Sequence, residues 1–235
     1  MNENDEAVVL MRIILTGGGT GGHIYPALAV AERLQECHPE CEILYVGTDR
    51  GLEKDIVPKR NIPFRTIRAE GLPRKLTPAL LKAVKNTAGG CLEARDIVKS
   101  FQPDVVIGTG GYVCGPVVLA AKLQGIPTMI HEQNAFPGIT NKLLARFVDC
   151  IMVNFEESKK YFVHKERIAV TGLPVRQEVL SAEKTASLAY FGFSEDKTTL
   201  LVSGGSRGAR SLNRAMVDAY PELLKYPDLQ IIHLT

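Results

Sequence analysis

Short apolar runs alternate along this chain with segments whose apolar positions repeat at helical spacing. Residues 12–16 form the first run, and a helix face follows it at the i, i+3, i+4, i+7 positions Ala27, Val30, Ala31 and Leu34, with Pro26 expected in the first helical turn. Further runs predict strands at 43–46, 64–67, 104–108, 127–130, 150–153 and 168–171. Helices are predicted at 52–57, 79–85, 92–100, 116–123, 139–146 and 156–162, and Gly89-Gly90 is expected to interrupt or kink the helix between 79–85 and 92–100. Apolar runs without polar alternation are typical of parallel strands covered on both faces, so residues 11–172 are predicted to form one doubly wound α/β domain.

A second unit of the same kind is predicted after this domain. Residues 173–198 are interpreted as a linker and the start of a second lobe, and residues 199–235 as strand 199–203, helix 212–224 and strand 229–234. One strand–helix–strand unit leaves its sheet faces and edges uncovered. We therefore expect the sequence to stop inside its second domain. Residues 1–10 are acidic and are predicted to be a disordered tail without the basic start of a signal peptide.

The most informative stretch is Gly17-Gly18-Gly19-Thr20-Gly21-Gly22-His23, between the first strand and the first helix. Strand, glycine turn and helix direct backbone N–H groups and the positive end of a helix at an anion. The spacing of Gly17, Gly19 and Gly22 also fits a dinucleotide fingerprint, and Asp49 lies near the position of a ribose-binding acid. An NAD-dependent oxidoreductase and a purely structural turn therefore remain alternatives at this point.

Three further motifs follow strands. These are the glycine turn 108–112, the polar group His131-Glu132-Gln133-Asn134, and the second-lobe turn 204–209. Open parallel sheets bind ligands at the carboxyl ends of their strands. His131 and Glu132 are candidates for that edge, with hydrogen-bond partners behind the site as the alternative for each.

Composition and charge narrow the function classes. The net charge of +2 and the absence of a basic run with interleaved aromatic residues argue against a nucleic-acid partner. The five cysteines are scattered and do not complete a metal site. The longest uncharged run, 105–121, is broken by glycine and proline, which predicts no transmembrane helix. Residues 71–100 combine basic and apolar positions, which suits an anionic membrane surface or a helix packed on the sheet.

The motifs together resemble glycosyltransferase family 28. Five of them occur in order and at matching intervals: 18–23, 110–112, 131–134, Pro174-Val175-Arg176, and Gly204-Gly205-Ser206-x-Gly208-Ala209. The resemblance implies a GT-B fold, with an N-terminal acceptor lobe and a C-terminal donor lobe, both Rossmann-like, on either side of a cleft. It also implies transfer of GlcNAc from UDP-GlcNAc to the muramyl 4-hydroxyl of lipid I, the undecaprenyl-diphosphate-linked MurNAc-pentapeptide. The transfer inverts the anomeric centre and gives lipid II for the cell wall.

The resemblance also assigns roles to residues. Donor-contacting positions are Thr20, Gly21, Gly22, Asn134, Arg176 and Ser206. Positions facing the diphosphate of the acceptor are Gly18, Gly19, Gly110, Gly111 and Tyr112. The basic–apolar segment near Leu80 would face the anionic inner membrane, so the protein is expected to be peripheral on the cytoplasmic face.

An inverting transfer needs a base for the attacking hydroxyl and stabilisation for the departing UDP. His23 is the predicted base, because imidazole accepts protons near neutral pH, and Glu132 is the second candidate. No Asp-x-Asp motif is present, so no metal or other cofactor is predicted, and the turn 204–209 with Arg176 would stabilise the leaving diphosphate. Leu173 departs from the Asn that the family often carries before Pro-Val-Arg. Because the donor lobe is incomplete, little activity is expected from the chain alone, and a non-catalytic acceptor lobe that needs a separate donor subunit is an alternative.

Overall fold

The chain forms two compact units that meet in sequence at Arg176 and Gln177. A computed structural model describes residues 10–71, 78–205 and 208–235, and it describes side chains of the helix that starts at Pro78 from residue 87 onward. The boundary between the units follows the position predicted from sequence, 172, by four residues. The predicted N-terminal tail falls almost entirely on residues 1–9, which lie outside the described residues.

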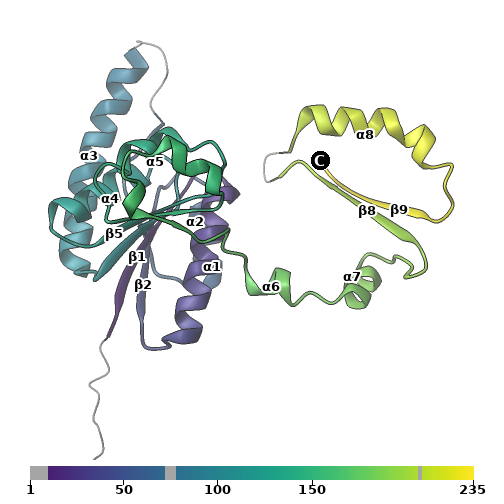
Figure 1. Cartoon of the computed structure of the whole chain (residues 1–235), viewed down its shortest axis with the longest axis horizontal. Coiled ribbons are helices and arrows are strands. Elements are labelled where there is room, and N and C mark those ends of the chain that lie inside the picture. The colour runs from purple at the N-terminus through teal and green to yellow at the C-terminus, as the bar shows by residue number, and fades with distance from the viewer. Residues whose placement is uncertain (1–9, 72–77, 206–207) are drawn as a thin grey trace, which may run out of the picture. The chain divides into compact units, whose positions relative to one another are not determined.

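Unit 1 is built on a seven-stranded parallel sheet (Figure 1). Its order is β3-β2-β1-β4-β5-β6-β7, so the chain starts in the middle, moves to one edge and then returns to build the other. The strands are β1 (Arg12–Thr16), β2 (Glu42–Gly47), β3 (Phe64–Thr66), β4 (Val105–Gly108), β5 (Thr128–Glu132), β6 (Cys150–Val153) and β7 (Ile168–Val170). The reversal between β1 and β4 is the topological switch point at which such sheets bind ligands.

Helices cover both faces of this sheet. They are α1 (Gly21–Cys37), α2 (Glu53–Ile56), α3 (Pro78–Phe101), α4 (Cys114–Leu123) and α5 (Ile139–Leu144), with the 3₁₀ turns η1 (Pro58–Arg60), η2 (Glu156–Tyr161) and η3 (Lys165–Arg167). Adjacent residues of a strand point to opposite faces, and β1 shows this directly. Ile14 packs into the cluster made with α3 and α4, whereas Ile13 and Leu15 pack into the cluster made with α1.

Two local predictions about helices were wrong. α3 is one continuous helix, and Gly89-Gly90 does not interrupt it. The glycines instead allow a close approach, because a Cβ on Gly90 would lie 1.8 Å from the carbonyl oxygen of Arg68. Similarly, α1 starts at Gly21, which places Pro26 in the second turn rather than the first.

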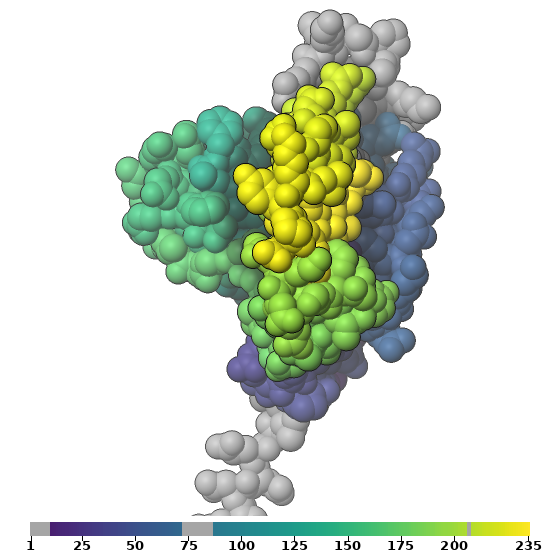
Figure 2. Space-filling model, turned by 90° about the vertical axis from the view of Figure 1, so that its right-hand side faces the viewer, coloured from purple at the N-terminus to yellow at the C-terminus, as the bar shows by residue number. Residues whose placement is uncertain are grey.

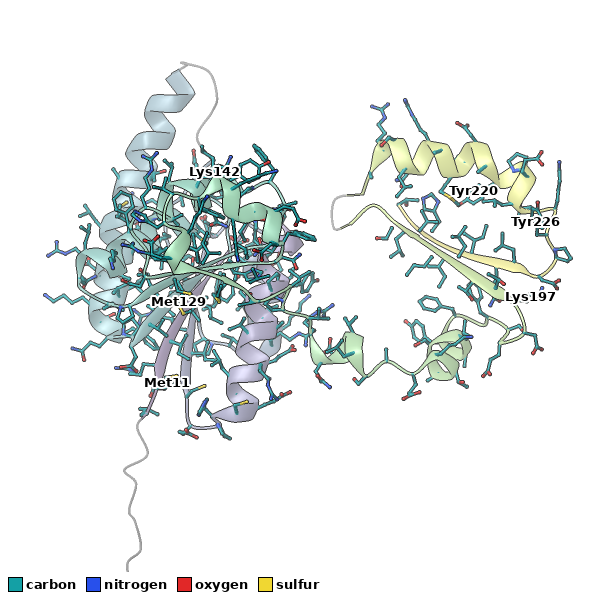
Figure 3. The ribbon with its side chains drawn as sticks, in the orientation of Figure 1. Met11, Met129, Lys142, Lys197, Tyr220 and Tyr226 are labelled. Atoms are coloured by element: carbon teal, nitrogen blue, oxygen red, sulfur yellow. The ribbon has the colours of Figure 1, made fainter. Side chains whose placement is uncertain are left out.

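Unit 2 contains two parallel strands and one long helix. Its elements are α6 (Gln177–Leu180), α7 (Lys184–Tyr190), β8 (Thr198–Ser203), α8 (Arg210–Leu223) and β9 (Leu229–Leu234), coloured green to yellow in Figure 2. Strands β8 and β9 pair in parallel, as the sequence predicts for a strand–helix–strand unit. Tyr220, labelled in Figure 3, joins α8 to β9 through a 2.7 Å contact between its hydroxyl and Nδ1 of His233.

Candidate functional site

The candidate site lies in unit 1, at the carboxyl ends of β1, β2, β4 and β5. The loops that leave β1 and β4 carry the two glycine turns, and the parallel register of Thr16 with Gly108 sets the turns side by side. In Figure 3, Met11 marks the opposite, amino end of β1, and Lys142 on α5 lies toward the carboxyl end of the sheet.

The two glycine turns interlock. The N–H of Gly18 donates to the carbonyl of Gly110 over 3.2 Å. Gly110 and Gly111 have φ angles of +110° and +85°, in the region that favours glycine. A Cβ on Gly111 would lie 2.4 Å from the carbonyl oxygen of Gly18, so neither turn tolerates a side chain at the contact.

His23 lies against this pair of turns. Its Nδ1 is 2.9 Å from the carbonyl oxygen of Gly18, and because that oxygen only accepts, we assign the ring proton to Nδ1. The lone pair of the neutral imidazole is then on Nε2. No group in the described part of the chain hydrogen-bonds to Nε2, whose ring edge lies against Gly110. The geometry gives His23 a nitrogen that can accept a proton from a ligand.

The first turn of α1 provides N–H groups for an anion. Thr20 is the N-cap residue in an extended conformation, but its side chain makes no capping hydrogen bond. The N–H groups of Gly21 and Gly22 have no acceptor among residues 10–71, 78–205 and 208–235. Free donors at the positive end of a seventeen-residue helix favour a phosphate or another anion.

Tyr112 adds an aromatic ring to the same place. An ideal Cβ on Gly19 would lie 3.4 Å from Cε1 of Tyr112, so the half-buried ring borders the first glycine turn. The fold therefore brings into one place the five residues that were predicted to face the acceptor diphosphate: Gly18, Gly19, Gly110, Gly111 and Tyr112.

Glu132 has the surroundings of a structural carboxylate. It is 1% exposed, and its two oxygens accept hydrogen bonds from four N–H groups. The donors are the backbone N–H and the side-chain amide of Asn134, the backbone N–H of Gly138, and the side-chain amide of Asn141. A carboxylate held in this way favours the hydrogen-bonded alternative over the predicted role of a second base, since its lone pairs are engaged. It fixes the exposed Asn134, one of the predicted donor contacts.

His131 connects the same strand to the end of the domain. Its Nε2 is 2.8 Å from the carbonyl of Gly172, and Nδ1 is 3.2 Å from Nε2 of Gln133. Burial lowers the pKa of His131, because desolvation disfavours the imidazolium more than the hydrogen bond to Gly172 and the charge of Glu132 favour it. Gln133 also donates to the carbonyl of Thr109 over 2.7 Å. His131 therefore has a supporting place behind the glycine turns.

Arg176 reaches the first helix. Its guanidinium carbon lies 4.4 Å above the ring of Tyr25, two residues after His23. This cation–π contact brings a predicted donor contact to the N-terminal part of α1. Ser206, the remaining predicted donor contact, lies outside the described residues.

Sequence reasoning missed three residues that shape the site. Thr109 donates its hydroxyl to the carbonyl of His23 over 2.6 Å. Cys114 is fully buried, with its sulfur within 3.0 Å of the carbonyls of Thr16 and Gly110, and burial raises the pKa of this thiol to about 12. Glu53 contacts the first glycine turn through the N–H of Gly19. No spacing rule connects these residues to the turns, although Gly47 and Gly51 around Glu53 were a local sign of crowding.

The described residues include no group of three or more His, Cys, Asp or Glu side chains arranged to hold a metal ion. Within that same part of the chain, no helix is long and apolar enough to cross a bilayer.

A parallel sheet with a switch point, two interlocked glycine turns and a histidine at a helix start define a nucleotide-sugar or phosphate-handling α/β enzyme class. The sequence model of the glycosyltransferase family 28 N-terminal domain matches residues 13–153. The chain belongs to this family. Membership decides against the NAD-dependent oxidoreductase that the glycine spacing and Asp49 had left open.

Relatives whose names state a function extend the comparison. The chain is 57% identical over 225 residues to a protein of Desulforamulus reducens and 51% identical to one of Bacillus subtilis. Both relatives are named UDP-N-acetylglucosamine–N-acetylmuramyl-(pentapeptide) pyrophosphoryl-undecaprenol N-acetylglucosamine transferase. Each match covers 96% of this chain but only 60% and 61% of the relatives, so the chain spans about three fifths of their length.

Solved structures show the same architecture. The crystal structure of Acinetobacter baumannii MurG matches 95% of this chain and 60% of its own with a TM-score of 0.66 and 31% identity. A UDP-GlcNAc 2-epimerase from Neisseria meningitidis, with UDP-GlcNAc bound, matches with a TM-score of 0.65 at 16% identity, which shows a shared fold alone. The α/β architecture of the GT-B class predicted from sequence is confirmed.

Proposed function

We propose that this chain carries the acceptor-binding part of an inverting N-acetylglucosaminyltransferase. The enzyme moves GlcNAc from UDP-GlcNAc to the muramyl 4-hydroxyl of lipid I and forms lipid II. The observation that carries the proposal is the combination of free N–H groups at Gly21 and Gly22 with an open Nε2 on His23, all within the first turn of α1. The names of the relatives at 57% and 51% identity support the choice of substrates.

The residues of unit 1 supply the base and the anion site. The acceptor hydroxyl oxygen attacks C1 of GlcNAc, its proton passes to Nε2 of His23, and the bond from C1 to the UDP oxygen breaks on the opposite face. General-base assistance of this kind contributes about 10²- to 10⁴-fold in rate. The glycine turns at Gly18–Gly19 and Gly110–Gly111, bordered by Tyr112, would let the acceptor diphosphate approach the backbone beside the free N–H groups of Gly21 and Gly22.

The donor would be contacted from three places in unit 1. Thr20, Gly21 and Gly22 form that turn, Asn134 is fixed by Glu132, and Arg176 stacks on Tyr25. No metal enters this proposal, because backbone donors and Arg176 balance the charge of the leaving diphosphate.

A lipid-linked acceptor requires the protein to bind a membrane, and α5 with the loop before it offers an apolar surface for this contact. Phe136, Ile139 and Leu143 are 66%, 72% and 53% exposed. Lys142 lies with its ammonium 4.0 Å above the ring of Phe136. Apolar side chains beside a cation suit an anionic bilayer at the cytoplasmic face. The segment near Leu80, predicted for the same role, lies outside the described side chains.

The test is product formation by the protein extended to the length of its relatives. Incubated with UDP-GlcNAc and lipid I in vesicles of anionic lipid, it should form β-linked GlcNAc–MurNAc lipid and free UDP. UDP-glucose in place of UDP-GlcNAc is the control. Failure to form the disaccharide lipid, with the protein folded, would contradict the proposal.

A further inference from the structure

The buried carboxylate of Glu53 lies directly beneath the first glycine turn. Its side chain is 0% exposed, and its oxygens accept three hydrogen bonds. Oε1 accepts from the backbone N–H of Thr48 at 3.1 Å and from its hydroxyl at 2.8 Å, and Oε2 accepts from the N–H of Gly19 at 3.0 Å. In the described part of the chain, no Lys or Arg forms an ion pair with this carboxylate.

The contact with Gly19 continues to His23 through a single peptide bond. The N–H of Gly19 and the C=O of Gly18 belong to the same peptide group. The N–H donates to Glu53 over 3.0 Å, and the C=O accepts from Nδ1 of His23 over 2.9 Å. The order of groups is therefore carboxylate, peptide, imidazole.

The carboxylate has almost no freedom to move. An ideal Cβ would lie 2.5 Å from Oε1 of Glu53 at Gly18, 2.0 Å from Oε2 at Gly51, and 2.6 Å from Cγ at Gly47. Glycine at these three positions leaves the space that the carboxylate fills. A charge held rigidly in a buried place polarises the groups that donate to it more strongly than one in water.

A peptide that donates to an anion becomes a better acceptor at its oxygen, because successive hydrogen bonds polarise one another. We propose that Glu53 is a positioning residue for His23, acting through the Gly18–Gly19 peptide. It keeps the ring proton on Nδ1, leaves Nε2 open, and stabilises the imidazolium that forms when Nε2 takes a proton. The arrangement resembles the carboxylate of a catalytic triad, with a peptide group inserted between the acid and the histidine.

This inference rests on the proposed role of His23 as base, but its first test does not need activity. Nitrogen-15 NMR of the chain labelled at histidine distinguishes the two neutral tautomers, and the signals of His23 are assigned by their loss in His23→Ala. Above neutral pH we expect the Nδ1–H form to dominate at His23. A predominant Nε2–H form in the wild-type chain would overturn the proposal even if the Glu53→Gln protein does not fold.

The substitution Glu53→Gln then removes the charge at nearly constant shape. We expect a mixture of tautomers at His23. In the protein extended to the length of its relatives, kcat should fall about 10- to 100-fold, with KM for UDP-GlcNAc changed by less than about threefold. The acidic limb of the kcat/KM profile should move to lower pH, because the imidazolium loses its remote counter-charge.

Two matched variants separate positioning from stability. Thr48→Val removes one donor to Oε1 but leaves the charge and the Gly19 contact, so it should lower stability and keep the Nδ1–H tautomer. Glu93→Gln makes the same chemical change at a carboxylate that pairs with Arg68, away from the turns, and should leave kcat unchanged. A folded Glu53→Gln protein with the wild-type tautomer and pH profile would refute the proposal. Loss of all GlcNAc transfer in the wild-type enzyme would refute the function instead, and leave the tautomer result standing.

Discussion

At the scale of single residues, the candidate site depends on backbone contacts that only glycine permits. Gly111 combines a φ of +85° with a Cβ position 2.4 Å from the carbonyl oxygen of Gly18. Gly125, after α4, has a similar φ of +75° but nothing within 4 Å of its Cβ position. A comparison of alanine substitutions at these two glycines of unit 1 therefore distinguishes the cost of backbone strain from the cost of a steric clash.

We expect Gly111→Ala to lower the free energy of unfolding by roughly 3 kcal/mol or more. The left-handed conformation costs about 1–2 kcal/mol, and overpacking against Gly18 adds about 1–3 kcal/mol. Gly125→Ala should show the strain alone, about 1–2 kcal/mol. Urea unfolding followed by far-UV circular dichroism measures both. Equal losses in the two variants would contradict the interlocked turns.

At the scale of elements, α3 shows how tertiary contact overrides a local signal. Gly89 and Gly90 differ sharply in what surrounds them. A Cβ on Gly90 would meet the backbone carbonyl of Arg68 at 1.8 Å, whereas one on Gly89 would meet only the flexible guanidinium at 3.2 Å. Glu93 on the same helix also accepts from the backbone N–H of Arg68 at 2.7 Å.

Gly90→Ala should therefore destabilise unit 1 by roughly 2 kcal/mol or more, because the segment at Arg68 has to move away from the helix. Gly89→Ala should be neutral or stabilising by up to about 1 kcal/mol, since alanine is the better helix former. Thermal unfolding of the two single variants, compared with wild type, measures the difference. A Gly90→Ala protein as stable as Gly89→Ala would rule out the close approach.

The elements that sequence predicts well are those with a periodic apolar signal. All seven strands of unit 1 were predicted to within a residue or two. The central strands β1, β2 and β4 are the clearest, because burial on both faces leaves an uninterrupted apolar run. The continuity of α3 was not predictable, because it depends on Arg68, ten residues before the helix starts. Glu53 was missed for the same reason: its partner Gly19 is 34 residues away.

The site was predictable in its glycines and in His23, and less so in its supporting groups. The turns carry their own signal, since glycine spacing after a strand is local. The roles of Glu132 and His131 depend on what surrounds each side chain. Four N–H donors around one carboxylate come from a loop and from α5, and no spacing rule predicts them.

At the scale of the whole molecule, the two units differ in how much they bury. In β1 four of the five residues are buried, and in β8 Val202 is the one buried residue among six. Unit 1 packs two hydrophobic clusters, one on each face of its sheet. A two-stranded sheet with one helix has little apolar contact to hold it closed.

Amide hydrogen exchange should reflect this difference. We expect backbone amides of β1 and β4 to exchange at least about tenfold more slowly than those of β8 and β9 in the chain as it stands, because local opening of unit 2 costs less free energy. Mass spectrometry of peptic fragments after timed labelling measures both units in one sample. Equal protection in the two units would contradict the ranking.

The central claim is that His23, held between the two glycine turns, accepts the proton of the attacking hydroxyl. The most direct measurement is turnover of His23→Ala, in the protein extended to the length of its relatives, together with calorimetric binding of UDP-GlcNAc. His38→Ala is the control, because His38 lies after α1 with a solvent-exposed ring near Glu40. The account predicts that kcat of His23→Ala falls by at least about 100-fold while the donor dissociation constant changes by less than about threefold. A kcat within threefold of wild type would contradict it.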